Sequence, residues 1–150
     1  MSTPALSLPE ARILNIRQEI QVKASLETTF AALLEQLGPG FTNMEGTPMP
    51  LKLEAHPGGR WYRDLDRENG HFWGSVQAIK RPTLLEFCGP LMLSFPAVHN
   101  VQYRLTESNG GTLIKFQHLA AGPIPAEKED GMPKGWDHIL TEVRKRAEKR

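Results

Sequence analysis

An apolar stripe near the C-terminus constrains the fold of this chain more than any other feature. The stripe consists of Trp136, Ile139, Leu140, Val143 and Ala147, at steps of three, one, three and four residues. This spacing places all five side chains on one face of a helix of about three turns. Such a helix needs a large apolar surface to pack against, and the preceding sequence provides one in the form of a sheet.

Segments that alternate apolar and polar residues predict this sheet. Asn69-Gly70 is the strongest hairpin signal, because both residues readily adopt positive φ, and Asn109-Gly110-Gly111 marks another turn. Pro57-Gly58-Gly59 interrupts a strand and indicates a bulge or a sharp bend. The expected strands cover residues 13–22, 51–56, 60–65, 71–79, 84–88, 98–106 and 112–119.

One further helix is expected directly after the first strand. Ser25 is a good N-cap, apolar residues from Leu26 to Leu37 follow at helical spacing, and Gly38-Pro39-Gly40 ends the run. A strand, a helix, several antiparallel strands and a final helix opening at Gly135-Trp136 form an α+β order. We therefore expect a single domain over 11–150, with a curved antiparallel sheet wrapped around the C-terminal helix, after a flexible leader at 1–10.

Length, charge and cysteine content narrow the class of protein. A chain of 150 residues favours one domain, and a net charge of +1 gives no electrostatic footprint for nucleic acid. Cys88 is the only cysteine, so an intramolecular disulfide is excluded and a reducing cytoplasm is the expected location. No apolar run approaches the roughly 20 residues that a membrane-spanning helix needs.

Four motifs, in this order, resemble those of a known superfamily. They are Gly58-Gly59-Arg60-Trp61, Gly74-x-Val76-x-x-Ile79 with Pro82 and Leu84 after it, Gly111-Thr112-x-Ile114-x-Phe116-x-His118, and Gly135-Trp136-x-x-x-Leu140. Together they resemble the START-like (SRPBCC) superfamily, and within it the family named for homology to the activator of the heat-shock-protein-90 ATPase. The resemblance implies the helix-grip fold. Relatives in the wider superfamily bind lipids, hormones or polyketides, and some are enzymes.

A pocket between the sheet and the last helix is the expected binding site. Strict alternation places Phe72 inside and Trp73 outside, where an exposed tryptophan would suit a homodimer contact. His118, and to a lesser degree His99, should point inward as a hydrogen-bonded rim residue, as a polar anchor for a ligand or as a general base. The alternative for the aromatic residues is plain core packing. The candidate ligand-binding residues are Trp61, Phe72, Val76, Val101, Tyr103, Ile114, Phe116, His118, Trp136 and Leu140.

The sequence contains no recognisable catalytic or metal-binding motif. It has no HxH, HxxxH or HExxH pair, no GxSxG, and no phosphate-binding loop after Gly58-Gly59. We therefore expect no metal, no cofactor and no assigned catalytic residue. The predicted function is a binding domain for a small hydrophobic or aromatic molecule, with no nucleic-acid or membrane partner. A chaperone-associated protein-interaction domain and a cyclase- or hydrolase-type enzyme are the alternatives.

Overall fold

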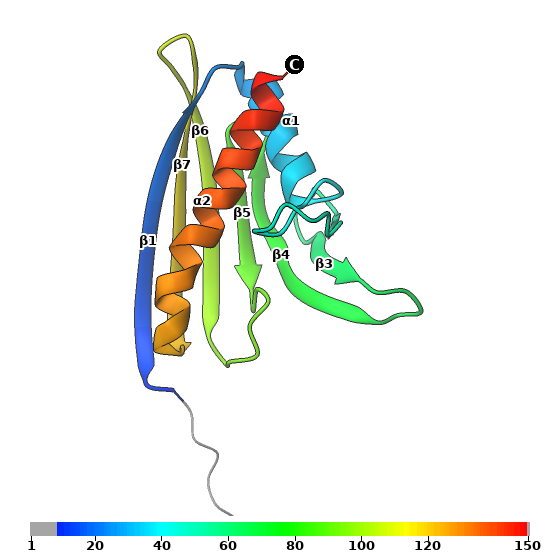
Figure 1. The fold of residues 1–150 in the computed structure, drawn as a ribbon, viewed down its shortest axis with the longest axis vertical. Coiled ribbons are helices and arrows are strands. Elements are labelled where there is room, and N and C mark those ends of the chain that lie inside the picture. The colour runs from blue at the N-terminus through cyan, green and yellow to red at the C-terminus, as the bar shows by residue number, and fades with distance from the viewer. Residues whose placement is uncertain (1–8, 150) are drawn as a thin grey trace, which may run out of the picture.

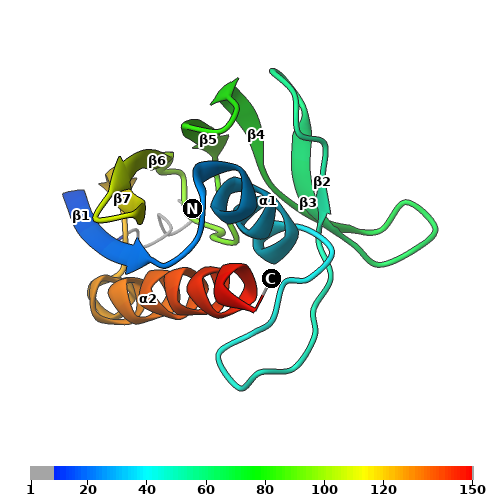
Figure 2. The same cartoon turned by 90° about the horizontal axis from the view of Figure 1, so that it is seen from above.

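The computed structural model describes residues 9–149 as a seven-stranded antiparallel sheet that curls around two helices (Figures 1 and 2). This confirms the expected α+β helix-grip fold. The strand order is β1-β7-β6-β5-β4-β3-β2. The predicted leader at 1–10 falls almost entirely outside the described residues. The elements are β1 (Ala11–Val22), α1 (Leu26–Leu37), β2 (Lys52–Leu53), β3 (Arg60–Asp64), β4 (Gly70–Lys80), β5 (Leu84–Gly89), β6 (Val98–Ser108), β7 (Gly111–Pro123) and α2 (Ala126–Glu148).

Helix α1 has the predicted boundaries because its caps form as expected. The Ser25 hydroxyl accepts a hydrogen bond from the Thr28 backbone N–H at 3.1 Å, and Gly38 provides the C-cap. Trp61 on β3 donates its indole N–H to the carbonyl of Leu37 at 2.7 Å. This bond satisfies a carbonyl that the end of the helix would otherwise leave unpaired, and it attaches α1 to the sheet.

Helix α2 begins at Ala126, well before the expected start at Trp136. The predicted long connection to Gly135 is therefore wrong. The buried side chains of α2 start at Trp136 and end at Ala147, as the apolar stripe indicated. The earlier turns bury no side chain and include Pro133, so they carry no apolar periodicity by which a helix could be recognised. Within residues 9–149, no helix is long and apolar enough to cross a bilayer.

The Pro57-Gly58-Gly59 segment is a chain reversal, not a bend within one strand. The Gly59 N–H donates to the His56 carbonyl at 2.8 Å, and β2 and β3 pair antiparallel on either side. A side chain at Gly59 would overlap the Glu54 carbonyl oxygen. The two segments expected as one interrupted strand are thus the two arms of a hairpin.

A β-bulge at Trp73 overturns the predicted orientation of two aromatic residues. Trp61 pairs with Gly74 while Tyr62 pairs with Phe72, so Trp73 is the extra residue on β4. The bulge turns Trp73 inward, where it is 3% exposed, and leaves Phe72 50% exposed. Phe72 therefore does not line the inner face, and Trp73 is not available for a homodimer contact.

The two turns predicted from Asn-Gly pairs differ in the structure. Asn109-Gly110 is a two-residue turn with φ values of 52° and 77°, as expected. Asn69-Gly70 instead lies at the end of a longer turn, in which Leu65 donates its N–H to the Asn69 carbonyl and residues 66–68 adopt positive φ. Gly70 is already part of β4.

Candidate functional site

The predicted ligand-binding residues, apart from Phe72, are buried but belong to two regions. Trp61 stacks on Phe87, with 4.5 Å between the ring centroids. It lies beside α1, because its indole N–H donates to the Leu37 carbonyl at the end of that helix. Val76 lies on β4, and the others come from β6, β7 and α2. All of them are at most 5% exposed: Trp61, Val76, Val101, Tyr103, Ile114, Phe116, His118, Trp136 and Leu140.

A continuous row of rings connects the sheet to α2. Tyr103 on β6 and Phe116 on β7 are paired across the two strands, and their ring centroids lie 5.1 Å apart. Phe116 in turn lies 4.9 Å from Trp136 on α2. The hairpin register set by the Asn109-Gly110 turn therefore brings aromatic residues directly beneath the helix.

A buried histidine pair continues this row toward the far end of β7. His99 Nδ1 and His118 Nε2 lie 2.9 Å apart, and Trp136 donates its indole N–H to His118 Nδ1 at 3.1 Å. Desolvation lowers the pKa of His99, and together with the neighbouring His99 ring it lowers the pKa of His118 to about 4. Both imidazoles are therefore neutral at pH 7.

Sequence reasoning placed both histidines inward but missed their contact. His118 pairs with Val101 and His99 pairs with Ala120, so the two imidazoles are diagonal neighbours on adjacent strands. The sequence does contain the information needed to predict this contact. The turn at Asn109-Gly110 sets this register, and diagonal same-face side chains on paired strands lie within reach of each other.

Seven buried side-chain polar atoms have no hydrogen-bond partner among the described residues, and three of them belong to inward-facing residues of β1 and β6. These three are Gln18 Oε1, His99 Nε2 and Tyr103 Oη. Burial raises the pKa of the Tyr103 phenol, which therefore stays protonated. A buried polar group without a partner costs about 1–3 kcal/mol, and native proteins leave few of them. These atoms contribute nothing to stability in this arrangement.

The sheet and α2 are in direct contact, with no open space between them at the ring row. A side chain that lined a void wide enough for water would keep accessible surface. Val101, Tyr103, Ile114 and His118 keep none. A ligand could therefore enter only after part of the wall moves.

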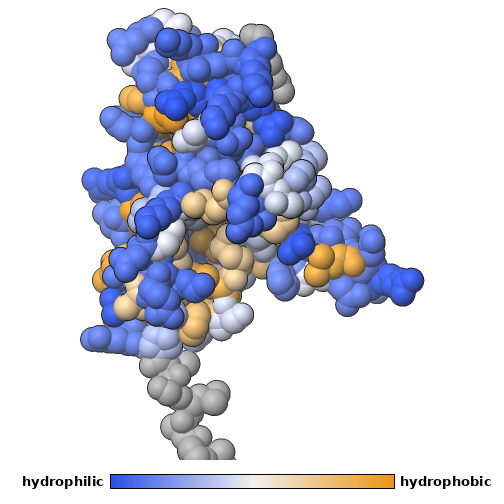
Figure 3. Space-filling view, in the orientation of Figure 1, coloured by the Kyte–Doolittle hydropathy of each residue, from blue (hydrophilic) through white to orange (hydrophobic). Residues whose placement is uncertain are grey.

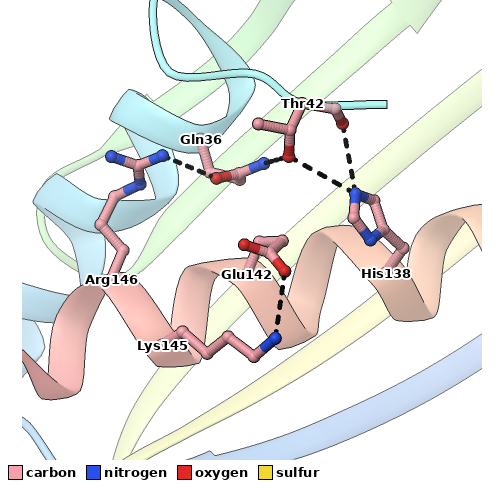
Figure 4. A network of polar contacts seen from close by, with 6 residues as sticks. All are labelled: Gln36, Thr42, His138, Glu142, Lys145 and Arg146. Carbon is pink, nitrogen blue, oxygen red and sulfur yellow. Dashed lines mark hydrogen bonds and ion pairs between the residues drawn. The ribbon is translucent and has the colours of Figure 1, made fainter. Parts of the chain in front are cut away.

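A polar network holds the C-terminal half of α2 in place (Figure 4). Arg146 donates to the side-chain oxygen of the fully buried Gln36 at 3.0 Å and to the Gly40 carbonyl at 3.1 Å. His138 donates its Nε2–H to the Thr42 carbonyl at 3.2 Å. Together with the apolar stripe, these bonds fix this half against α1 and the loop after it.

The N-terminal half of α2, residues 126–135, is held far more weakly. Its polar tethers to β1 are a 2.7 Å bond from Gln18 to the Pro133 carbonyl and a 3.1 Å pair between Arg12 and Glu129. That ion pair is about one-third exposed on each side, which makes it worth at most about 1 kcal/mol. Figure 3 shows hydrophobic surface in a hollow between this half and the β3–β4 hairpin. Met132 adds a partly buried apolar contact with the core. We expect this half to be displaced more easily than the half from Trp136 onward.

The outer face of the sheet carries a separate apolar patch. Ile13 and Val98 both pair with Ala121, so they lie on either side of β7. Ile13 is 84% exposed, Val98 72% and Leu119 36%. We refer to Ile13, Val98, Leu119 and Ala121 as the outer patch. Over residues 9–149, no three His, Cys, Asp or Glu side chains gather in a way that could hold a metal ion.

Comparison with known proteins agrees with this architecture. The model of the family described as Activator of Hsp90 ATPase homolog 1-like protein matches residues 23–148. No relative was found among the curated proteins. An uncharacterized protein from Rhizobium leguminosarum superposes with a TM-score of 0.73 at 14% identity, over 96% of this chain and 100% of that one.

Two further solved structures have the same fold. CalU16 from Micromonospora echinospora is 20% identical, with a TM-score of 0.60 over 91% of this chain and 76% of its own. The di-domain ARO/CYC StfQ from the steffimycin biosynthetic pathway is 10% identical, with a TM-score of 0.63 over 92% of this chain and 51% of its own. At these identities the likeness establishes the fold alone.

Proposed function

The chain belongs to the Activator of Hsp90 ATPase homolog 1-like family, and from this premise we propose that it binds a small hydrophobic or aromatic molecule between the sheet and α2. Domains with this fold commonly bind such ligands. One observation carries the proposal: polar atoms without partners lie in the otherwise apolar inner face. A wall built only for stability would have apolar side chains at these positions.

The composition of this wall suits an aromatic ligand. Tyr103, Phe116 and Trp136 offer ring faces, and aliphatic side chains such as Val101 lie beside them. Burying about 500 Å² of apolar surface, counted over ligand and protein, would gain about 12 kcal/mol. Association costs at least about 4 kcal/mol, so we expect a Kd in the micromolar range.

Entry of the ligand would require a displacement of residues 126–135. No side chain of that half is fully buried, whereas the half from Trp136 onward is fixed by the apolar stripe and by Arg146. The ligand would then replace the contacts that α2 makes with the inner face near Met132. Affinity would therefore include the cost of opening this half.

Native mass spectrometry of protein purified from its own host tests the proposal directly, because a bound molecule adds its mass. A fluorene titration, followed by tryptophan fluorescence, tests the location. Phe116→Gln should abolish fluorene binding, and Leu119→Gln on the outer face of the same strand should preserve it. The proposal fails if the native protein carries no small molecule and the wild type does not bind fluorene. Equal binding by both variants would also contradict it.

A second candidate function is a chaperone-associated protein-interaction domain, and the outer patch favours it. Ile13 and Val98 expose apolar surface that no described residue covers. A double Ile13→Ser, Val98→Ser variant would separate the two functions. If the patch binds an Hsp90-type chaperone, this variant should lose capture of the purified chaperone and any effect on its ATPase rate, while fluorene binding is kept.

A further inference from the structure

The direction of each hydrogen bond in the buried Trp136–His118–His99 row is fixed by chemistry. An indole N–H can only donate, so His118 Nδ1 must accept and the His118 proton is on Nε2. That Nε2–H then donates to His99 Nδ1, 2.9 Å away. Because His99 is also neutral, its single proton is on Nε2. The row therefore ends in an N–H donor that no described residue meets.

We propose that His99 Nε2–H is a recognition site for an acceptor oxygen of the ligand, such as the carbonyl of an aromatic ketone, and that Trp136 orients this donor through His118. The inference rests on the proposed binding function and adds to it the chemical group that the site selects. His99 would contact the ligand, whereas His118 and Trp136 would act as positioning residues.

The surroundings of His99 leave room for such a ligand once α2 opens. Its cross-strand partners are Gly89 on β5 and Ala120 on β7, and Ala97 lies two residues before it, just outside β6. Met132 is the side chain of α2 that packs against the cluster containing Ala97 and Ala120. Small side chains therefore flank His99, and the N-terminal half of α2 packs, through Met132, against the cluster that contains two of them.

Because His99 is buried, bulk solvent cannot be the hydrogen-bond partner of its Nε2–H. The residue is 4% exposed, so solvent does not satisfy its Nε2–H in this structure. A buried N–H without a partner favours any bound molecule that presents an oxygen acceptor, and it disfavours an isostere that lacks one. A bound water molecule could instead accept from the Nε2–H. In that case the site would not discriminate between a ligand with an oxygen acceptor and an isostere that lacks one.

A matched pair of probes tests this selection. 9-Fluorenone carries a carbonyl oxygen where fluorene carries a methylene group, and the two are otherwise alike in shape. The ratio of their Kd values should change by about fivefold to tenfold between the wild type and His99→Phe, which removes the donor. His99→Gln places an amide N–H near the former Nε2 position and should keep the wild-type ratio. Comparing ratios cancels the different solubilities of the probes.

The outcomes separate this inference from the proposed function. If both probes bind and the ratio is the same in the wild type and in His99→Phe, the donor site is refuted while hydrophobic binding stands. If neither probe binds the wild type, the donor site is refuted, and the proposed function fails with it when the native protein also carries no small molecule. Long-range ¹H–¹⁵N spectra of the ligand-free wild type test the row without any variant. They should show His99 protonated at Nε2, and protonation at Nδ1 would overturn the proposal.

Discussion

Acid should destabilise this protein through His118 in a pH range that the structure defines. The side chain is fully buried and its neutral form accepts the indole N–H of Trp136. Burial lowers its pKa from 6.5 to about 4 in the folded chain. In the unfolded chain the imidazole is exposed and titrates near 6.5. Between these values the unfolded chain binds a proton that the folded chain does not.

The sign and size of the effect follow from this difference. A folded-state pKa below the unfolded value leaves stability intact above pH 6.5 and lowers it as the pH falls toward 4. Between pH 7.5 and 4.5, His118 alone should lower the free energy of unfolding by about 2.5 kcal/mol. His99, whose pKa is also lowered by burial, acts in the same direction. Glu54, whose pKa is lowered to about 2 by its hydrogen bond to Arg60, affects mainly the range below 4.5.

Urea unfolding at pH 7.5, 6.5, 5.5 and 4.5 would measure this dependence. His118→Gln removes the titrating group but keeps an amide that can accept from Trp136 and donate to His99, so its curve should be flatter by about 2.5 kcal/mol over the range. His71→Gln, at an exposed position of β4, is the control and should follow the wild type. Parallel curves for the wild type and His118→Gln would refute the assignment of a neutral, buried His118.

Three further tests of the fold use single substitutions. Trp73→Ala should lower the free energy of urea unfolding by about 3–5 kcal/mol, and Phe72→Ala by under about 0.5 kcal/mol; the reverse order would contradict the bulge. Gly89→Ala should cost more than about 2 kcal/mol in thermal unfolding, because its Cβ would meet the β4 backbone at 2.5 Å, whereas Gly46→Ala, with open space around it, should cost about 1 kcal/mol. Gln36→Leu should cost about 1 kcal/mol or more in thermal unfolding, since it removes the hydrogen bonds of Gln36 to Arg146 and Thr42 and leaves Arg146 with its bond to the Gly40 carbonyl; an unchanged midpoint would show that the network in Figure 4 does not hold α2.

Periodicity predicted most of the fold because most strands keep one face buried throughout. The apolar stripe from Trp136 identified the packed face of α2, and the alternation around Phe116 identified the inner face of β7. Periodicity failed where an extra residue in a strand changes which face the following side chains occupy. The extra residue at Trp73 shifts the alternation by one, and strand periodicity alone does not reveal a bulge.

The candidate site was predicted as a set of side chains, without its hydrogen bonds. Inward placement of His99 and His118 followed from alternation. Their contact with each other required the hairpin register, and the bond from Trp136 required the position of α2 along β7. The absence of open space between the sheet and α2 depends on how whole side chains interlock, which no local pattern encodes.

Pro133 weakens the connection between the two halves of α2, so we expect amide protons before it to exchange faster than those from Trp136 onward. A proline has no N–H, so the helical bond back to Glu129 is missing at this position. Opening of the turns at 126–132 therefore breaks one helical hydrogen bond fewer than it would in a helix without proline. The part of α2 from Trp136 to Ala147 can stay folded while these turns open. The helix is continuous in shape, yet it contains a boundary at which local unfolding can stop.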